Sequence, residues 1–130
     1  MRELLDTLGL YDEVLDIGLD FNVGVGGRRL TSAQRQKLDV ARALIKHADF
    51  MIFNRPLAAL DQRSQDLVTK NVLAEATRDG RNPAILWVLP NPQLANLFEH
   101  IIVFQGGEVV EDGTHETLAK ENGIFTRLLA

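Results

Sequence analysis

The chain is organised around residues 30–56, which read LTSAQRQKLDVARALIKHADFMIFNRP. This stretch predicts a helix that begins after Thr31, because Thr31 and Gln34 fit a capping box, in which a hydroxyl and a side-chain amide satisfy free backbone donors reciprocally. Residues 50–53 are all apolar and have strand length, which is typical of a parallel strand covered by helices on both faces. The helix is expected to turn an apolar stripe toward the core, formed by Leu38, Ala41 and Ile45.

Further helices and strands are predicted on both sides of this stretch. In chain order the pattern favours two short helical pieces within 2–16, a glycine-rich loop over 17–30, a helix capped by Asp61 and stopped by Gly80, a strand over 84–89, a short helix, a strand pair over 100–104 and 108–111, and a final helix that Thr114 caps and Gly123 breaks. The helix after Asp61 is expected to bury Leu67, Val68, Val72, Leu73 and Ala76. This order predicts an α/β fold with a mostly parallel sheet flanked by helices.

Length and composition exclude several classes of protein. The 130 residues suffice for one domain, and the 45% hydrophobic and 25% charged residues are those of an ordinary globular chain. With 14 Lys and Arg against 18 Asp and Glu and no basic block, the chain is not expected to bind nucleic acid. It has no Cys, which excludes disulfides and thiolate metal sites. The longest apolar run, 84–89, is far shorter than the ~20 residues that span a bilayer, so no membrane-crossing segment is expected.

Five short motifs follow one another along the chain. They are VGVGG at 23–27, LTSAQRQK at 30–37 with VARAL at 40–44, FMIFNRP at 50–56, AALD at 58–61, and GEVVEDGTHE at 107–116. In this order they resemble motifs of the ATP-binding domain of ABC transporters: the VGEGG stretch of exporter-type members, the LSGGQRQR signature followed by ALARAL, the Walker B strand with its Asp-Glu-Pro ending, the SALD D-loop, and the family's G-x-I-V-E-x-G-T-H-E ending. The ordered set covers nearly the whole chain.

The resemblance implies the C-terminal half of such a domain, which is a partial P-loop NTPase fold. In the family the Walker A loop, GxxxxGK[ST], and the Q-loop lie upstream of the segment that this chain matches. The glycine-rich run 24–29 has neither the lysine nor the hydroxyl residue of a phosphate loop. We therefore expect one partial domain without the Walker A segment, with a helical signature-bearing part over 1–46 and a C-terminal core part over 47–130 that holds the Walker B-like strand and the tail.

The chain departs from the family at the positions that do chemistry. Where the family has the acidic residue that orders Mg²⁺, this chain has Asn54, whose amide brings no charge to a hard cation. The general-base position carries Arg55, whose guanidinium cannot accept a proton but can pair with a phosphate oxygen. The switch-histidine position carries Pro90, which has no imidazole. No catalytic residue is therefore expected to be intact.

The resemblance also implies nucleotide-binding residues. In the family the signature contacts phosphate held by a partner domain, and this role falls here on Thr31, Ser32, Ala33 and Gln34. Asn54 occupies the Walker B position, and Asp61 the D-loop position at the dimer seam. The hydroxyl at a helix N-terminus is retained at position 31, whereas the family's two glycines are replaced by residues whose Cβ atoms crowd the approach of phosphate.

Plainer interpretations of these residues stay open. Thr31, Gln34 and Asp61 would cap helices in any protein, and Asn54 and Arg55 can be surface residues at a strand end. Arg35, Lys37 and Arg42 are expected on a solvated helix face that lies near the dimer interface in the family. His47 and His100 lack partners at ligand spacing, so no metal site is predicted.

The implied function is that of the C-terminal part of the ATP-binding subunit of an exporter-type ABC transporter, on the cytoplasmic side of the inner membrane. The chain would contribute to ATP-driven dimerisation that powers transport, with ATP and Mg²⁺ as cofactors of the parent protein. A second nucleotide-binding domain and a transmembrane permease domain would be its partners. By itself the chain is expected to bind nucleotide weakly or not at all and to hydrolyse none. The alternatives are a non-catalytic pseudo-ATPase module for dimerisation or regulation, and a half-domain whose exposed sheet edge pairs with a separate chain.

Overall fold

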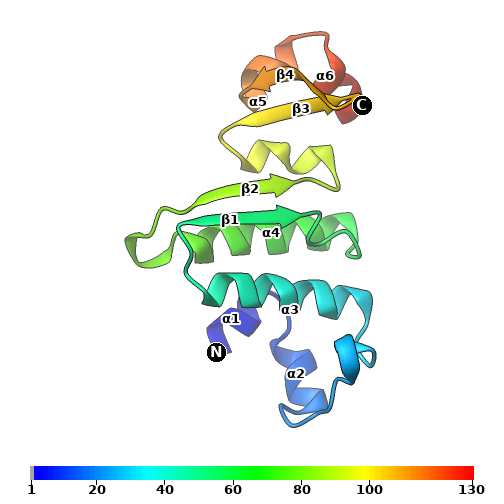
Figure 1. Ribbon diagram of the computed structural model, residues 1–130, viewed down its shortest axis with the longest axis vertical. Coiled ribbons are helices and arrows are strands. Elements are labelled where there is room, and N and C mark those ends of the chain that lie inside the picture. Colours follow the sequence, from blue (N-terminus) through cyan, green and yellow to red (C-terminus); the bar gives the residue numbers. More distant parts are fainter. Residues whose placement is uncertain (1) are drawn as a thin grey trace. The chain divides into compact units, whose positions relative to one another are not determined.

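The computed structural model describes residues 2–130 and divides the chain into two compact units, Met1–Val88 and Leu89–Ala130 (Figure 1). The boundary falls directly after the second strand. The first unit therefore contains both the signature-like and the Walker B-like motifs. The predicted subdivision into 1–46 and 47–130 separates the part with the signature-like motif from the part with the Walker B-like strand and the tail, and it stays a prediction.

The first unit consists of helices packed with a two-stranded parallel sheet. Gly9, with φ of 60°, separates the two short helices that the sequence predicts before the glycine-rich loop, and these helices are confirmed. In chain order the elements are α1 (Arg2–Thr7), α2 (Tyr11–Ile17), the 3₁₀ turn η1 (Val25–Gly27), α3 (Ser32–Ile45), β1 (Phe50–Asn54), α4 (Gln62–Ala76), the 3₁₀ turn η2 (Arg78–Gly80) and β2 (Ala84–Val88).

The capped helix α3 is confirmed, but its buried face differs from the predicted stripe. The helix buries Val40, Ala41 and Leu44, whereas Ile45 is 53% exposed. Ile45 is the last residue of α3, and the chain leaves the helix directly after it. The spacing of apolar residues does not show where a helix ends. It therefore placed Ile45 in the core, although this residue lies at the exposed end of α3.

The strands β1 and β2 pair in parallel, with Ile52 opposite Leu86 and Asn54 opposite Val88. Met51 and Phe53 are buried on one face, where the Phe53 and Trp87 ring centroids lie 4.8 Å apart. The prediction that both faces of 50–53 are covered is wrong. The other face is exposed to solvent, and its apolar side chains are Phe50, Ile52, Leu86 and Val88, with exposed fractions of 57%, 62%, 48% and 44%.

Asp61 caps helix α4, as predicted, and the helix ends before Gly80. Its C-cap is Thr77, and η2 occupies the residues up to the glycine. The predicted apolar face is wrong at Leu67, which is 59% exposed. The residues that α4 buries are Gln65, Val68, Thr69, Val72 and Ala76.

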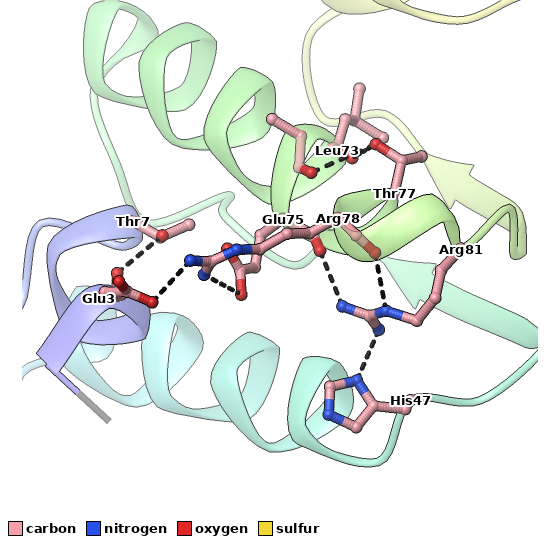
Figure 2. A network of polar contacts seen from close by, with 9 residues as sticks. Glu3, Thr7, His47, Leu73, Glu75, Thr77, Arg78 and Arg81 are labelled. Atoms are coloured by element: carbon pink, nitrogen blue, oxygen red, sulfur yellow. Dashed lines mark hydrogen bonds and ion pairs between the residues drawn. The ribbon is translucent and has the colours of Figure 1, made fainter.

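A network of polar side chains joins α1, the C-terminal end of α4 and the loop after α3 (Figure 2). Arg78 binds Glu3 and Glu75, with nitrogen–oxygen distances of 2.7 and 3.2 Å. Arg81 donates to the carbonyl oxygen of Glu75 at 3.0 Å, and its Nη1 lies 2.5 Å from Nδ1 of His47. His47 lies just before β1, and Arg78 and Arg81 lie just before β2, so the network connects the segments that lead into the two strands.

The second unit is built on an antiparallel hairpin of β3 (Ile101–Gln105) and β4 (Glu108–Gly113), with a register irregularity between Val103 and Phe104. It also contains η3 (Pro92–Leu97), α5 (His115–Lys120) and α6 (Ile124–Leu129), so the final helix breaks near Gly123 as predicted. The hairpin corrects the expected mostly parallel sheet: the described strands form one parallel and one antiparallel pair. The core of this unit is Ala95, Ile101, Val103, Leu118 and Phe125.

The described residues hold neither a helix that could span a membrane nor a group of side chains that could hold a metal ion. No helix within residues 2–130 has the length and apolar character needed to span a membrane. Over the same residues, no group of three or more His, Asp or Glu side chains is placed to hold a metal ion.

Candidate functional site

The start of α3, the end of β1 and the start of α4 lie at one end of the first unit, on the right in Figure 1. The chain runs along α3, returns along β1 and reverses again into α4, so all three ends meet there. In sheets of parallel strands this carboxyl end is where ligands bind. The structure thus brings together the signature-like, Walker B-like and D-loop-like positions.

The signature-like residues form the capped first turn of α3. The Thr31 hydroxyl oxygen accepts from the Gln34 amide at 3.1 Å, and Gln34 Oε1 accepts from the Thr31 amide at 2.9 Å. Ser32 Oγ accepts from Arg35 Nη2 at 3.2 Å, and Ala33 is half-buried. Thr31 and Gln34 therefore act as helix caps, and a role toward phosphate would be additional to this one.

Glu13 from α2 supports this first turn of α3, a contact that the sequence did not predict. Its Oε2 accepts from Gln34 Nε2 at 2.7 Å, and its Oε1 lies 3.5 Å from Lys37 Nζ. Lys37 also donates to the Gly9 carbonyl oxygen at 3.1 Å, and its side chain is only 14% exposed. The expected solvated face is therefore wrong at Lys37, whereas Arg35 and Arg42 are exposed. A contact between side chains 24 residues apart leaves no periodic signal in the sequence.

Asn54, the last residue of β1, and Arg55, which follows it, are both exposed. Arg55 has φ of 48°, a left-handed conformation that is unfavourable for a residue with a side chain, and its amide donates to the Val88 carbonyl oxygen at 3.1 Å. Among the described residues, its guanidinium has no hydrogen bond or ion pair, so its charge is available to a ligand. The strand end therefore presents an amide and a cation.

The D-loop-like segment, residues 58–61, is held by two glutamines. Gln36 Oε1 accepts from the Ala59 amide at 2.8 Å, and Gln65 Nε2 donates to the Leu60 carbonyl oxygen at 2.8 Å. Neither glutamine was singled out from the sequence, because a side chain-to-backbone bond has no motif. Asp61 closes the segment by capping α4, with Oδ1 accepting from the Ser64 amide at 3.0 Å and Oδ2 from the Ser64 hydroxyl at 2.6 Å. These bonds, the hydroxyl one first, lower the pKa of Asp61.

Pro90 lies in the second unit, between β2 and η3, and is half-buried. The next residue, Asn91, caps η3 by accepting from the Gln93 amide at 3.2 Å. The residues around Pro90 therefore serve the local turn.

No family model matches the chain. Curated relatives do: the chain is 34% identical over 132 aligned residues to an ATP-dependent lipid A-core flippase of Francisella tularensis, covering 98% of this chain. It is 30% identical to an uncharacterised ABC transporter ATP-binding protein of Sinorhizobium fredii, and 34% identical to the cyclolysin secretion/processing ATP-binding protein of Bordetella pertussis, over 97% and 87% of this chain. The chain spans only 21%, 21% and 15% of the length of these proteins, respectively.

A solved structure shares the fold. A bacterial Atm1-family ABC exporter with ATP bound superposes with a TM-score of 0.81 over 98% of this chain and 22% of that chain, at 22% identity. This likeness supports an ABC ATPase fold for the mixed α/β structure. The relatives that match almost all of this chain are ABC-transporter ATP-binding proteins, and they confirm its identification as an exporter-type segment of that family.

Proposed function

We propose that the chain is the C-terminal part of the ATP-binding subunit of an ABC exporter, and that the start of α3 contacts the phosphates of ATP held by a second ATP-binding domain. The observation that carries this proposal is the meeting of three features at one end of the first unit: the capped start of α3, the end of β1 and the 58–61 segment. The first turn of a helix presents free backbone donors and the positive end of the helix dipole, both of which favour phosphate.

The same geometry supports a role in nucleotide contact without hydrolysis by this chain's own residues. Arg55 stands where the family has its general base, and a guanidinium cannot take a proton from an attacking water. Its exposed charge instead suits a phosphate oxygen. Asn54 can accept a hydrogen bond from a metal-bound water but gives Mg²⁺ no charged ligand. Nucleotide would therefore act through closure of the two domains.

The wider assembly is proposed from the relatives. ABC exporters combine ATP-binding domains with membrane domains, so we place this segment in a transporter, on the cytoplasmic side of the inner membrane and next to a permease domain. ATP, with Mg²⁺, would be the cofactor of that assembly. The relatives named above differ in cargo, one being a lipid A-core flippase and one a cyclolysin secretion protein, so no cargo is assigned.

A second candidate is a non-catalytic module that dimerises or regulates without nucleotide. Asn54 and Arg55 favour it, since two acidic positions of the family carry an amide and a cation here. The two candidates differ in one measurable property. The first requires ATP for association with a second domain, and the second does not.

Association with a second domain tests the proposal. The chain is mixed with an ATP-binding domain of an ABC exporter that has an intact GxxxxGK[ST] loop, and sedimentation velocity is recorded with and without MgATP. We expect a complex only with MgATP. Ser32→Glu should abolish it, because a carboxylate at the start of α3 repels phosphate although it suits the helix dipole and so preserves the fold.

Ala119→Glu is the matched control, because it adds the same charge at an exposed position of α5 in the second unit. It should leave the complex intact. A complex that forms equally well without nucleotide would favour the regulatory module. An ATP-dependent complex that tolerates Ser32→Glu would contradict the proposed phosphate contact.

A further inference from the structure

The side chain of Gln36 links two functional segments that lie far apart in the sequence. Gln36 is half-buried in the second turn of α3, and its Oε1 accepts from the Ala59 amide at 2.8 Å across 23 residues of sequence. Ala59 lies in the 58–61 segment, two residues before the cap of α4. A hydrogen bond at this distance has normal geometry for an amide donor and a carbonyl acceptor.

The rest of the 58–61 segment is held by its own neighbourhood. Leu57, 1% exposed, anchors the chain just before it, and Gln65 of α4 donates to the Leu60 carbonyl oxygen. The Ala58 amide donates to the Arg55 carbonyl oxygen at 3.4 Å, which is long for a hydrogen bond. The Gln36 bond is different in kind, because it connects the segment to α3.

We propose that Gln36 is a positioning residue that couples the first turn of α3 to the 58–61 segment. Thr31 and Gln34 fix the first turn, and Gln36 follows directly on it. A ligand that shifts the start of α3 would thereby shift the Ala59 peptide and the approach to Asp61. The use of this coupling rests on the proposed function, since it would let phosphate contact at α3 alter the segment placed at the seam between two domains.

The coupling is tested on the whole chain without nucleotide, by hydrogen exchange of the Ala59 amide measured by NMR. Gln36→Met keeps side-chain length and helix preference but removes the oxygen acceptor. We expect it to speed Ala59 exchange about fivefold to tenfold, the usual effect of one hydrogen bond. Gln36→Glu retains an acceptor and should restore protection. The Val68 amide, inside α4, reports any change in global stability, and Gln93→Met is a control in the second unit.

A double-mutant cycle separates coupling from a local effect. Thr31→Ala loosens the first turn of α3 and should speed Ala59 exchange in the wild-type background, but add nothing once Gln36→Met has cut the link. Unchanged Ala59 exchange in Gln36→Met, or additive effects of the two substitutions, would overturn the proposal. If the chain shows no MgATP-dependent association but the two substitutions are non-additive, the proposed function alone is overturned. If association is normal but the two substitutions act additively, the coupling alone is overturned.

Discussion

At the scale of single residues, one of the two helix caps at the candidate site, Asp61, carries a charge. Asp61 caps α4 through Ser64, and these hydrogen bonds lower the pKa of Asp61 from the ordinary value of 3.8. A group whose pKa is lower in the folded state adds stability above its unfolded pKa and loses it as the pH falls through the folded one. The cap is therefore at full strength at neutral pH and weakens below pH 3.8.

Asp61→Asn tests this charge, because asparagine still caps a helix but carries no charge. We expect the variant to melt at a lower temperature than the wild type at pH 7, and the gap to close as the pH falls below 3.8. Melting followed by circular dichroism at several pH values measures the gap. A gap that stays constant across this range would show that the carboxylate charge has no part in the cap.

At the scale of elements, a leucine just before α4 belongs to the core, whereas a leucine within α4 lies on the surface. Leu57 is 1% exposed, so Leu57→Ala should cost about 2–5 kcal/mol of the free energy of unfolding. Leu67 is 59% exposed, so Leu67→Ala should change it by less than about 0.5 kcal/mol. Urea denaturation measures both variants. Equal losses would place Leu67 in the core, as its helical spacing in the sequence suggests.

Most elements could be predicted from the sequence because local rules place them. The capping residues Thr31, Asp61 and Thr114 are recognised from local sequence, and the structure confirms all three. Burial was less predictable. Ile45 and residues 50–53 have the composition of a core, yet the number of faces that neighbours cover is a tertiary property.

In the candidate site, too, the local features were predictable and the tertiary contacts were not. Motif order pointed to Thr31, Asn54 and Asp61, and the structure brings these positions to one end of the first unit. The supports of the site, Glu13 and Gln36, escaped prediction because they act through contacts with residues that lie far away in the sequence.

At the scale of the whole molecule, the exposed face of β1 and β2 predicts self-association. Its apolar side chains form one contiguous strip, and such strips favour association. Ile52→Thr keeps a β-branched side chain but adds a hydroxyl in the middle of the strip, so it should reduce concentration-dependent oligomers in sedimentation velocity. Leu128→Gln, at a 53% exposed site on α6, is the control and should not reduce them. Oligomers that persist equally in both variants would mean that another surface is responsible.

Binding of ATP to the purified chain, measured by calorimetry with and without Mg²⁺, tests most directly whether this segment is one half of a composite site. Its candidate residues supply a helix N-terminus, one exposed guanidinium and no carboxylate for the metal at the strand end, so we expect no saturable heat at millimolar nucleotide under either condition. Saturable binding, above all binding indifferent to Mg²⁺, would show that the start of α3 and Arg55 hold nucleotide unaided. That result would contradict the requirement for a second domain.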